Sequence, residues 1–113
     1  MSDSPPRKRR EKRPPKPLDS VRLRDLALAY VARYSTSTGK LENYLTRKLR
    51  ERGWEDEAEP DVRGLIDRYV ELGYIDDAAY AQSRSGGLLR RGFGARRVSQ
   101  DLYAAGIDEH LRA

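Results

Sequence analysis

Apolar residues recur at intervals of three and four positions over most of this chain, which is the spacing that places them on one face of an α-helix. The pattern predicts six helical segments: residues 20–34, a segment that follows the polar cluster 35–39 and ends near residue 52, residues 60–72, 77–91 and 95–105, and the start of a sixth after Ile107. We therefore expect an all-α fold built from short helices.

One junction between two of these helices is specified at almost every position of residues 71–81. Gly73 can adopt, without steric cost, the left-handed conformation that ends a helix. Tyr74 follows it, placed to pack back on Tyr69, and Asp76 then supplies an oxygen that caps the next helix. We expect this junction to fix the angle between the two helices.

The same helix stop occurs three more times, as a leucine followed four residues later by a glycine and then by a large apolar residue. The three glycines are Gly53, Gly92 and Gly106. This recurrence predicts an internal helical repeat, with two tandem three-helix units at residues 18–75 and 76–113. Stacked units of this kind form an elongated body in which most contacts are between neighbours.

The aromatic residues fall mainly at core positions of the predicted helices. Tyr30 and Tyr34 lie in the apolar stripe of the first helix, so we interpret them as packing residues rather than as a surface on which nucleic-acid bases stack. Trp54 is the single tryptophan and is assigned to the core, where it would cover Leu49. The adjacent glycines at positions 86 and 87 predict either a break in their helix or the close approach of another backbone.

Charge is distributed unevenly along the chain. Residues 1–17 hold seven basic and two acidic residues, and their net charge of +5 equals that of all 113 residues, so the rest of the chain is formally neutral. This segment also holds five prolines and few apolar residues, so we expect a disordered basic arm. Its basic residues are Arg7, Lys8, Arg9, Arg10, Lys12, Arg13 and Lys16. The arm could contact DNA or another polyanion, could be a solubilising tail, or could be a nuclear-import signal.

Two groups of basic residues in the helical body are candidate sites for phosphate or for a protein partner. One surrounds the predicted turn at residues 92–94 and consists of Arg84, Arg90, Arg91, Arg96 and Arg97. The other is the outward face of the second helix, with Arg47, Lys48 and Arg50. Guanidinium groups match phosphate and carboxylate geometry in a bidentate manner. The alternative is a solvated helix face, which in the second group would be paired with neighbouring glutamates.

Acidic residues are concentrated between positions 55 and 61. They suit the positive end of the helix that follows. Their alternative role is an intramolecular dock for the basic arm.

Several kinds of chemistry lack support in the sequence. It holds no cysteine and a single histidine, His110, so neither a disulfide nor a thiolate or histidine metal site is expected. The adjacent Asp76 and Asp77 provide too few ligands for calcium or magnesium. We find no phosphate-binding glycine loop, no apolar run of membrane-spanning length and no signal peptide. We therefore predict a cytoplasmic protein that is not an enzyme and uses no cofactor, metal, small-molecule substrate or membrane.

Three blocks of sequence point to a family. They read Leu-x-x-x-Leu-x-x-x-Gly-Trp from residue 45, Gly-Tyr-Ile-Asp-Asp-x-x-Tyr-Ala from residue 73 and Arg-Arg-Gly-Phe-Gly-Ala-Arg-Arg-Val from residue 90. Over residues 18–113 the chain resembles the RecX family of bacterial recombination regulators. The resemblance implies binding to the RecA recombinase in the helical groove of its filament on single-stranded DNA, with restraint of ATPase activity and strand exchange. It also implies that both basic groups meet acidic and phosphate surfaces of that groove.

RecX-like chains usually continue into a third three-helix unit, so we expect this chain to be either a fragment or a natural short variant. Its second unit lacks a closing helix, and we expect Leu102, Ile107 and Leu111 to be exposed apolar surface. Three functions remain open. They are a monomeric RecA regulator with single-stranded DNA as a candidate partner, a stand-alone helical nucleic-acid-binding module that depends on its basic arm, and an inert fragment of a longer regulator.

Overall fold

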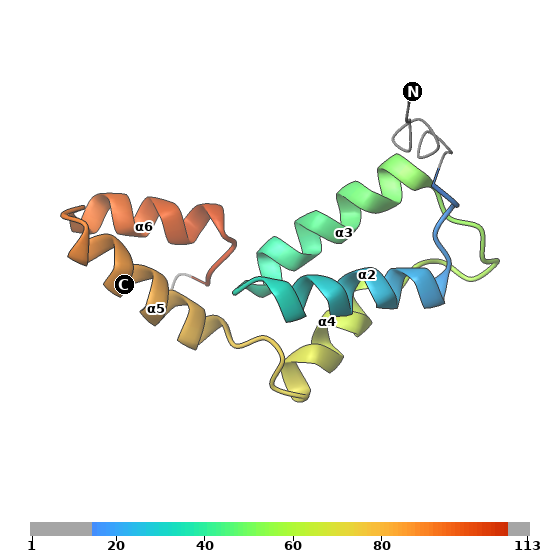
Figure 1. Cartoon of the computed structure of the whole chain (residues 1–113), viewed down its shortest axis with the longest axis horizontal. Coiled ribbons are helices and arrows are strands. Elements are labelled where there is room, and N and C mark those ends of the chain that lie inside the picture. The colour runs from blue at the N-terminus through green and yellow to red at the C-terminus, as the bar shows by residue number, and fades with distance from the viewer. Residues whose placement is uncertain (1–14, 109–113) are drawn as a thin grey trace, which may run out of the picture.

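The computed structural model describes residues 15–108, and within them the chain folds into five helices (Figure 1). These are α2 (Ser20–Arg33), α3 (Thr38–Arg52), α4 (Val62–Glu71), α5 (Asp77–Arg90) and α6 (Ala95–Ala104). Each corresponds to a helix that the apolar pattern predicts, and the all-α fold class is confirmed. The sixth predicted segment falls largely on residues beyond those described.

Side chains cap the first turn of four helices. Asp19, Ser37, Asp61 and Asp76 each accept a hydrogen bond from the backbone N–H three residues later, at 2.8, 3.1, 2.9 and 3.0 Å. Such caps satisfy N–H groups that have no partner inside the helix. Because Asp61 caps α4, Pro60 lies before that helix and not in its first turn, where the sequence pattern had placed it.

Glycines in a left-handed conformation end helices α3 to α6. Gly53, Gly73, Gly92 and Gly106 have φ values between 74° and 93°. At the last three, the N–H of the following apolar residue donates to a carbonyl five residues earlier, at 2.8 to 3.1 Å, and the chain folds back on its own helix. Gly53 differs from the predicted repeat, because its ψ of 176° sends the chain onward in extended form.

The extended segment after Gly53 closes the N-terminal end of the fold. Leu18 and Trp54 form an isolated parallel β-bridge, in which Leu18 N donates to Gly53 O and Glu55 N donates to Leu18 O, both at 2.9 Å. The acidic loop that follows also holds the start of α2, since Asp56 accepts a hydrogen bond from Ser20 N at 2.9 Å. These contacts explain why Leu18 is fully buried although it precedes the first helix.

Helices α2, α3 and α4 enclose a first core. Its buried residues are Leu18, Leu23, Ala27, Leu41, Leu45, Ile66, Tyr69 and Ile75. Trp54 packs against this core, as predicted, and its indole N–H donates to Ala58 O at 2.7 Å. Val70 is 46% exposed, because Ile66 and Tyr69 occupy the inward positions of α4.

Helices α5 and α6 enclose a second core. Its buried residues are Tyr80, Ala81, Leu88, Val98, Leu102, Ala105 and Ile107. Leu102 and Ile107 are only 1% and 3% exposed, so the expectation that they form open apolar surface is wrong. The N–H of Ile107 donates to Leu102 O at 3.0 Å, so Ile107 folds back over the end of α6. Leu111 lies outside the described residues.

A contact of small and polar residues joins the two cores. The buried Ser37 hydroxyl donates to Ala105 O at 2.6 Å. The backbone N–H and the hydroxyl of Thr38 both donate to the Asp77 carboxylate at 2.8 Å. Gly39 lies so close to the end of α6 that a Cβ on it would be 2.7 Å from Ala105 O. The start of α3 therefore holds the start of α5 and the end of α6, where the two parts of the chain approach each other in Figure 1.

Candidate functional site

Four of the five arginines in the first predicted group lie on and around the exposed turn between α5 and α6. We call this region the turn surface, and it consists of Arg90, Arg91, Phe93, Arg96 and Arg97. The guanidinium carbons of Arg91 and Arg97 lie 5.4 and 4.6 Å from the centre of the Phe93 ring. The ring is half-buried against the second core and the arginines are exposed. A fixed ring flanked by two cations can present guanidinium groups to phosphate or carboxylate oxygens.

Arg84, the fifth arginine of this group, is engaged within the fold. Its Nε and one terminal nitrogen donate to the two carboxylate oxygens of Asp101, both at 2.8 Å. The hydrogen bond from Arg84 lowers the pKa of Asp101 below its ordinary value, although partial burial opposes this shift. The pair links α5 to α6, so Arg84 has a structural role and is not part of the turn surface.

The two adjacent glycines of α5 make room for Arg90. The helix continues unbroken through positions 86 and 87, and within residues 15–108 no backbone outside this helix comes within 4 Å of a Cβ built on either glycine, so both sequence-based alternatives are wrong. The nearest group is the Arg90 guanidinium, whose terminal nitrogen lies 3.3 Å from the position that a Cβ on Gly86 would occupy. The glycines therefore let this side chain fold back along its own helix.

The second predicted group lies on α3, and we call Arg47, Lys48 and Arg50 the α3 face. Arg47 and Lys48 both approach Glu51, at 3.7 and 3.5 Å, and all of these side chains are exposed or half-exposed. Exposed ion pairs of this kind contribute little to stability, so the cations remain available to a partner. Arg47 and Lys48 also lie over the Tyr44 ring, at 5.5 and 5.8 Å from its centre.

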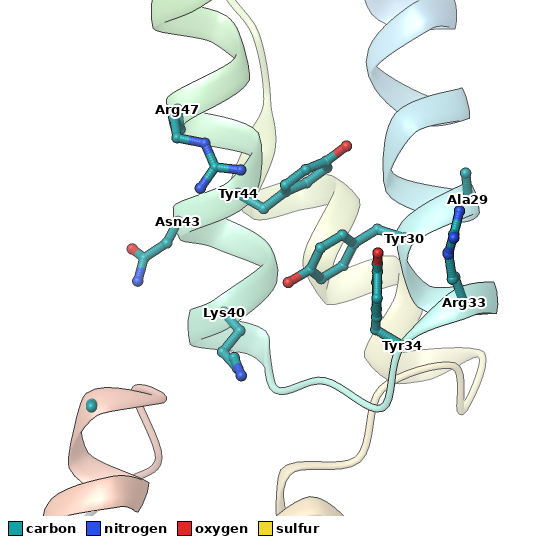
Figure 2. A pocket seen from close by; sticks show the side chains of 9 residues that line it. Ala29, Tyr30, Arg33, Tyr34, Lys40, Asn43, Tyr44 and Arg47 are labelled. Atoms are coloured by element: carbon teal, nitrogen blue, oxygen red, sulfur yellow. The ribbon is translucent and has the colours of Figure 1, made fainter.

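Beside the α3 face, three tyrosines and three cations line an open pocket of about 590 Å³. We call it the tyrosine pocket, after Tyr30, Tyr34 and Tyr44, with Arg33, Lys40 and Arg47 around them. Figure 2 shows the rings between α2 and α3. Tyr30 and Tyr44 stack with their centres 4.3 Å apart, and Tyr34 is tilted by 52° against Tyr30 at 5.1 Å.

The tyrosine pocket corrects the sequence-based assignment of Tyr34 to the core, since that side chain is 50% exposed. Tyr34 is the C-cap residue of α2, where the chain leaves the helix in extended form and turns the side chain away from the first core. Tyr30 is only partly buried, and its ring also faces the pocket. The sequence signal that could have indicated the pocket is the pair of tyrosines four residues apart beside Arg33.

The remaining predicted residues are placed as follows. Of the basic arm, the structure describes only Lys16, whose carbonyl accepts a hydrogen bond from Arg52 at 2.9 Å. The other basic residues of the arm and the single histidine lie outside the described residues; they are Arg7, Lys8, Arg9, Arg10, Lys12, Arg13 and His110. Within residues 15–108, acidic and histidine side chains form no cluster of three or more that could hold a metal ion. In the same part of the chain, no helix is long and apolar enough to cross a membrane.

Fold and surfaces together define an all-α helical-repeat protein with exposed arginine-rich surfaces. The family model described as RecX, second three-helix domain, matches residues 76–113. Proteins named regulatory protein RecX are similar over more of the chain. The one from Ectopseudomonas mendocina is 38% identical over 79 residues, which cover 66% of this chain and 49% of the relative.

Two further relatives named regulatory protein RecX extend the similarity. The protein from Mycobacterium sp. (strain JLS) is 32% identical over 86% of this chain and 52% of its own length, and that from Myxococcus xanthus is 29% identical over 96% and 62%. The chain belongs to the RecX family, and it spans about half the length of the curated relatives that it matches. No solved structure matches it.

Proposed function

We propose that this chain regulates the RecA recombinase in the cytoplasm, by binding in the groove of the RecA filament on single-stranded DNA and restraining ATPase activity and strand exchange. The observation that carries the proposal is its similarity to proteins named regulatory protein RecX over 66% to 96% of its length. The described residues provide surfaces that suit such a partner, because exposed arginines can pair with both acidic side chains and phosphates.

The turn surface and the α3 face are the proposed contact regions. Arg91 and Arg97 are held beside the Phe93 ring, which limits the conformational entropy that they lose on binding. The two regions lie on different helical units, and the contact between Ser37, Thr38 and Asp77 and the end of α6 fixes their separation. A ligand with two spaced contact regions can bridge filament protomers and shift the filament toward the state that it binds more tightly.

A filament sedimentation assay tests this proposal. RecA is assembled on single-stranded DNA with a slowly hydrolysed nucleotide, and the filaments are pelleted with the full chain or with a variant that lacks residues 1–14. The deletion removes six of the seven basic residues of the arm but keeps Lys16 and Pro17, which accept hydrogen bonds from Arg52 and Arg22. We expect both proteins to pellet with filaments, at levels well above those with bare DNA.

The alternative is a nucleic-acid-binding module that acts without RecA and depends on the arm. It predicts that the shortened protein stays in the supernatant and that the full chain binds bare DNA as well as it binds filaments. Its affinity should also fall steeply with salt, because binding would rest on phosphate neutralisation. That result would contradict the regulator proposal.

A further inference from the structure

The tyrosine pocket combines two rings that pack against the first core with one, Tyr34, that is half-exposed. A tyrosine ring that is 50% exposed, as Tyr34 is, leaves apolar surface in water that a core position would bury. The pocket lies at the junction of the two helical units, since Ala104 of α6 also contributes to its wall. Any molecule bound there would contact both units.

The ring arrangement leaves one tyrosine able to accept a planar ligand. Tyr30 and Tyr44 stack on each other, so those two faces are already covered. Tyr34 has Tyr30 beside it at a tilt, and the Arg33 guanidinium lies 5.7 Å from its ring centre. Aromatic rings and guanidinium planes are the two kinds of surface on which unpaired bases stack. An unpaired base can therefore stack on the exposed part of the Tyr34 ring, beside the Arg33 guanidinium.

The positive charge of the pocket favours an anionic ligand. Arg33, Lys40 and Arg47 line it, and no aspartate or glutamate does. Asn43 lies in the same wall and carries both a donor and an acceptor for the edge of a base. A positive, aromatic surface without carboxylates is the combination that binds single-stranded nucleic acid with little sequence preference.

The same chemistry continues beyond the pocket. A neighbouring pocket of about 330 Å³ shares Lys40 and is lined by Arg91 and by Arg84, whose guanidinium is paired with Asp101. Lys40 also lies 5.9 Å from the centre of the Tyr80 ring. Arg91 leads on to Phe93 in the turn surface. Basic and aromatic side chains thus follow one path from α3, across the junction, to the turn between α5 and α6.

We propose that the tyrosine pocket is a binding site for single-stranded nucleic acid, in which an unpaired base stacks on Tyr34 and the adjacent phosphates meet Lys40, Arg33 and Arg47. The strand continues past Lys40 toward Arg91. This site does not require RecA and is separate from the basic arm, so it can hold even if the regulator proposal fails.

A matched pair of tyrosine variants tests the site in the full chain. Tyr34→Ala removes the stacking surface. Tyr74→Ala is the control, because Tyr74 is 52% exposed and contacts one neighbouring ring, Tyr69, at 5.3 Å, yet does not line the tyrosine pocket. Affinity is measured by fluorescence anisotropy with a labelled oligothymidylate of about 16 nucleotides, without RecA. We expect Tyr34→Ala to weaken binding about 5-fold or more and Tyr74→Ala to leave it unchanged.

Two further measurements locate the ligand. Lys40→Gln should reduce the slope of log affinity against log salt by roughly 0.7, the value for one phosphate of a single strand. Photocrosslinking with 5-iodouracil in the oligonucleotide should label the tryptic peptide of residues 34–40, which cleavage after Arg33 and Lys40 releases.

The proposal is overturned if Tyr34→Ala and Tyr74→Ala bind the oligonucleotide equally well, or if the crosslink lies only in the basic arm. A competition experiment with a polyglutamate peptide can also overturn it. The peptide would have to displace the oligonucleotide from the wild type, and Tyr34→Ala would have to weaken binding of the peptide but not of the oligonucleotide. In that case the pocket takes an acidic peptide. Loss of affinity for duplex DNA equal to the loss for the single strand would exclude base stacking, because paired bases cannot reach Tyr34.

Discussion

Replacing Gly39 by alanine should destabilise this protein, although the same change in a helix normally stabilises it. Gly39 lies in the first turn of α3, and an alanine Cβ there would be 2.7 Å from Ala105 O and 2.8 Å from the Gly106 Cα. Both are backbone atoms, so the junction between the two units has to open. Overpacking of this kind costs typically about 1–3 kcal/mol.

Two other contributions affect the net change in the free energy of unfolding. Alanine is about 1 kcal/mol more favourable than glycine for helix stability in a helix interior, and the difference is smaller in a first turn. Opening the junction also weakens the buried hydrogen bond from the Ser37 hydroxyl to Ala105 O, which contributes about 1 kcal/mol. We therefore expect Gly39→Ala to lower the free energy of unfolding by about 1–3 kcal/mol.

Gly87→Ala is the matched control, because it makes the same substitution inside α5, where the nearest atom outside its helix backbone is an Arg90 terminal nitrogen at 4.0 Å. That side chain can move, so the control should raise stability by about 0.5–1 kcal/mol. Urea unfolding followed by the helical circular dichroism signal measures both. If Gly39→Ala is as stable as Gly87→Ala, the close contact between α3 and the end of α6 is not formed in solution.

Three further substitutions test an ion pair, a helix cap and a helix-ending glycine. Arg84→Gln should reduce stability at neutral pH, because it removes the partner of the Asp101 carboxylate. The folded pKa of Asp101 lies below its ordinary value of 3.8, so the stability difference between wild type and variant should disappear as the pH falls below that value. Urea unfolding at a series of pH values measures this, and a difference that stays constant with pH would contradict the pairing. Ser37→Ala removes a helix cap and leaves Ala105 O without its donor, so thermal unfolding should reveal a loss of about 1–3 kcal/mol, and an unchanged midpoint would argue against both contacts. Gly73→Ala places a side chain at φ 78° and should lower the free energy of unfolding by about 1–2 kcal/mol in the same assay. An unchanged stability would mean that the junction between α4 and α5 has another conformation.

The features predicted correctly from sequence are those specified locally. The periodic apolar residues located all five described helices, and Asp76 caps α5 as predicted. Glycine followed by a large apolar residue marked the ends of α4 and α5, because the left-handed conformation depends only on the residue that adopts it.

The features that sequence reasoning missed depend on contacts between distant segments. The burial of Leu102 and Ile107 arises because α5, α6 and the turn at Gly106 close over one core, which helix periodicity cannot reveal. The exposure of Tyr34 arises because α2 ends beside it and the chain turns toward α3. The exit at Gly53 was mispredicted because Leu18, more than thirty residues earlier, pairs with Trp54 there.

The most direct test of whether this chain regulates RecA is the DNA-dependent ATPase activity of RecA, measured while this protein is titrated in. Arg91, Arg96 and Arg97 are changed together to alanine, which leaves the Arg84 to Asp101 pair in place. The control changes the exposed Arg24, Arg63 and Arg68 of α2 and α4 to alanine and alters the net charge equally. Both variants are first shown by circular dichroism to retain the wild-type helix content.

We predict that the wild type and the control inhibit the ATPase and that the turn-surface variant does so much less. Equal inhibition by both variants would place the contact elsewhere on the chain. No inhibition by the wild type, at concentrations well above that of RecA, would contradict the claim that this chain regulates RecA.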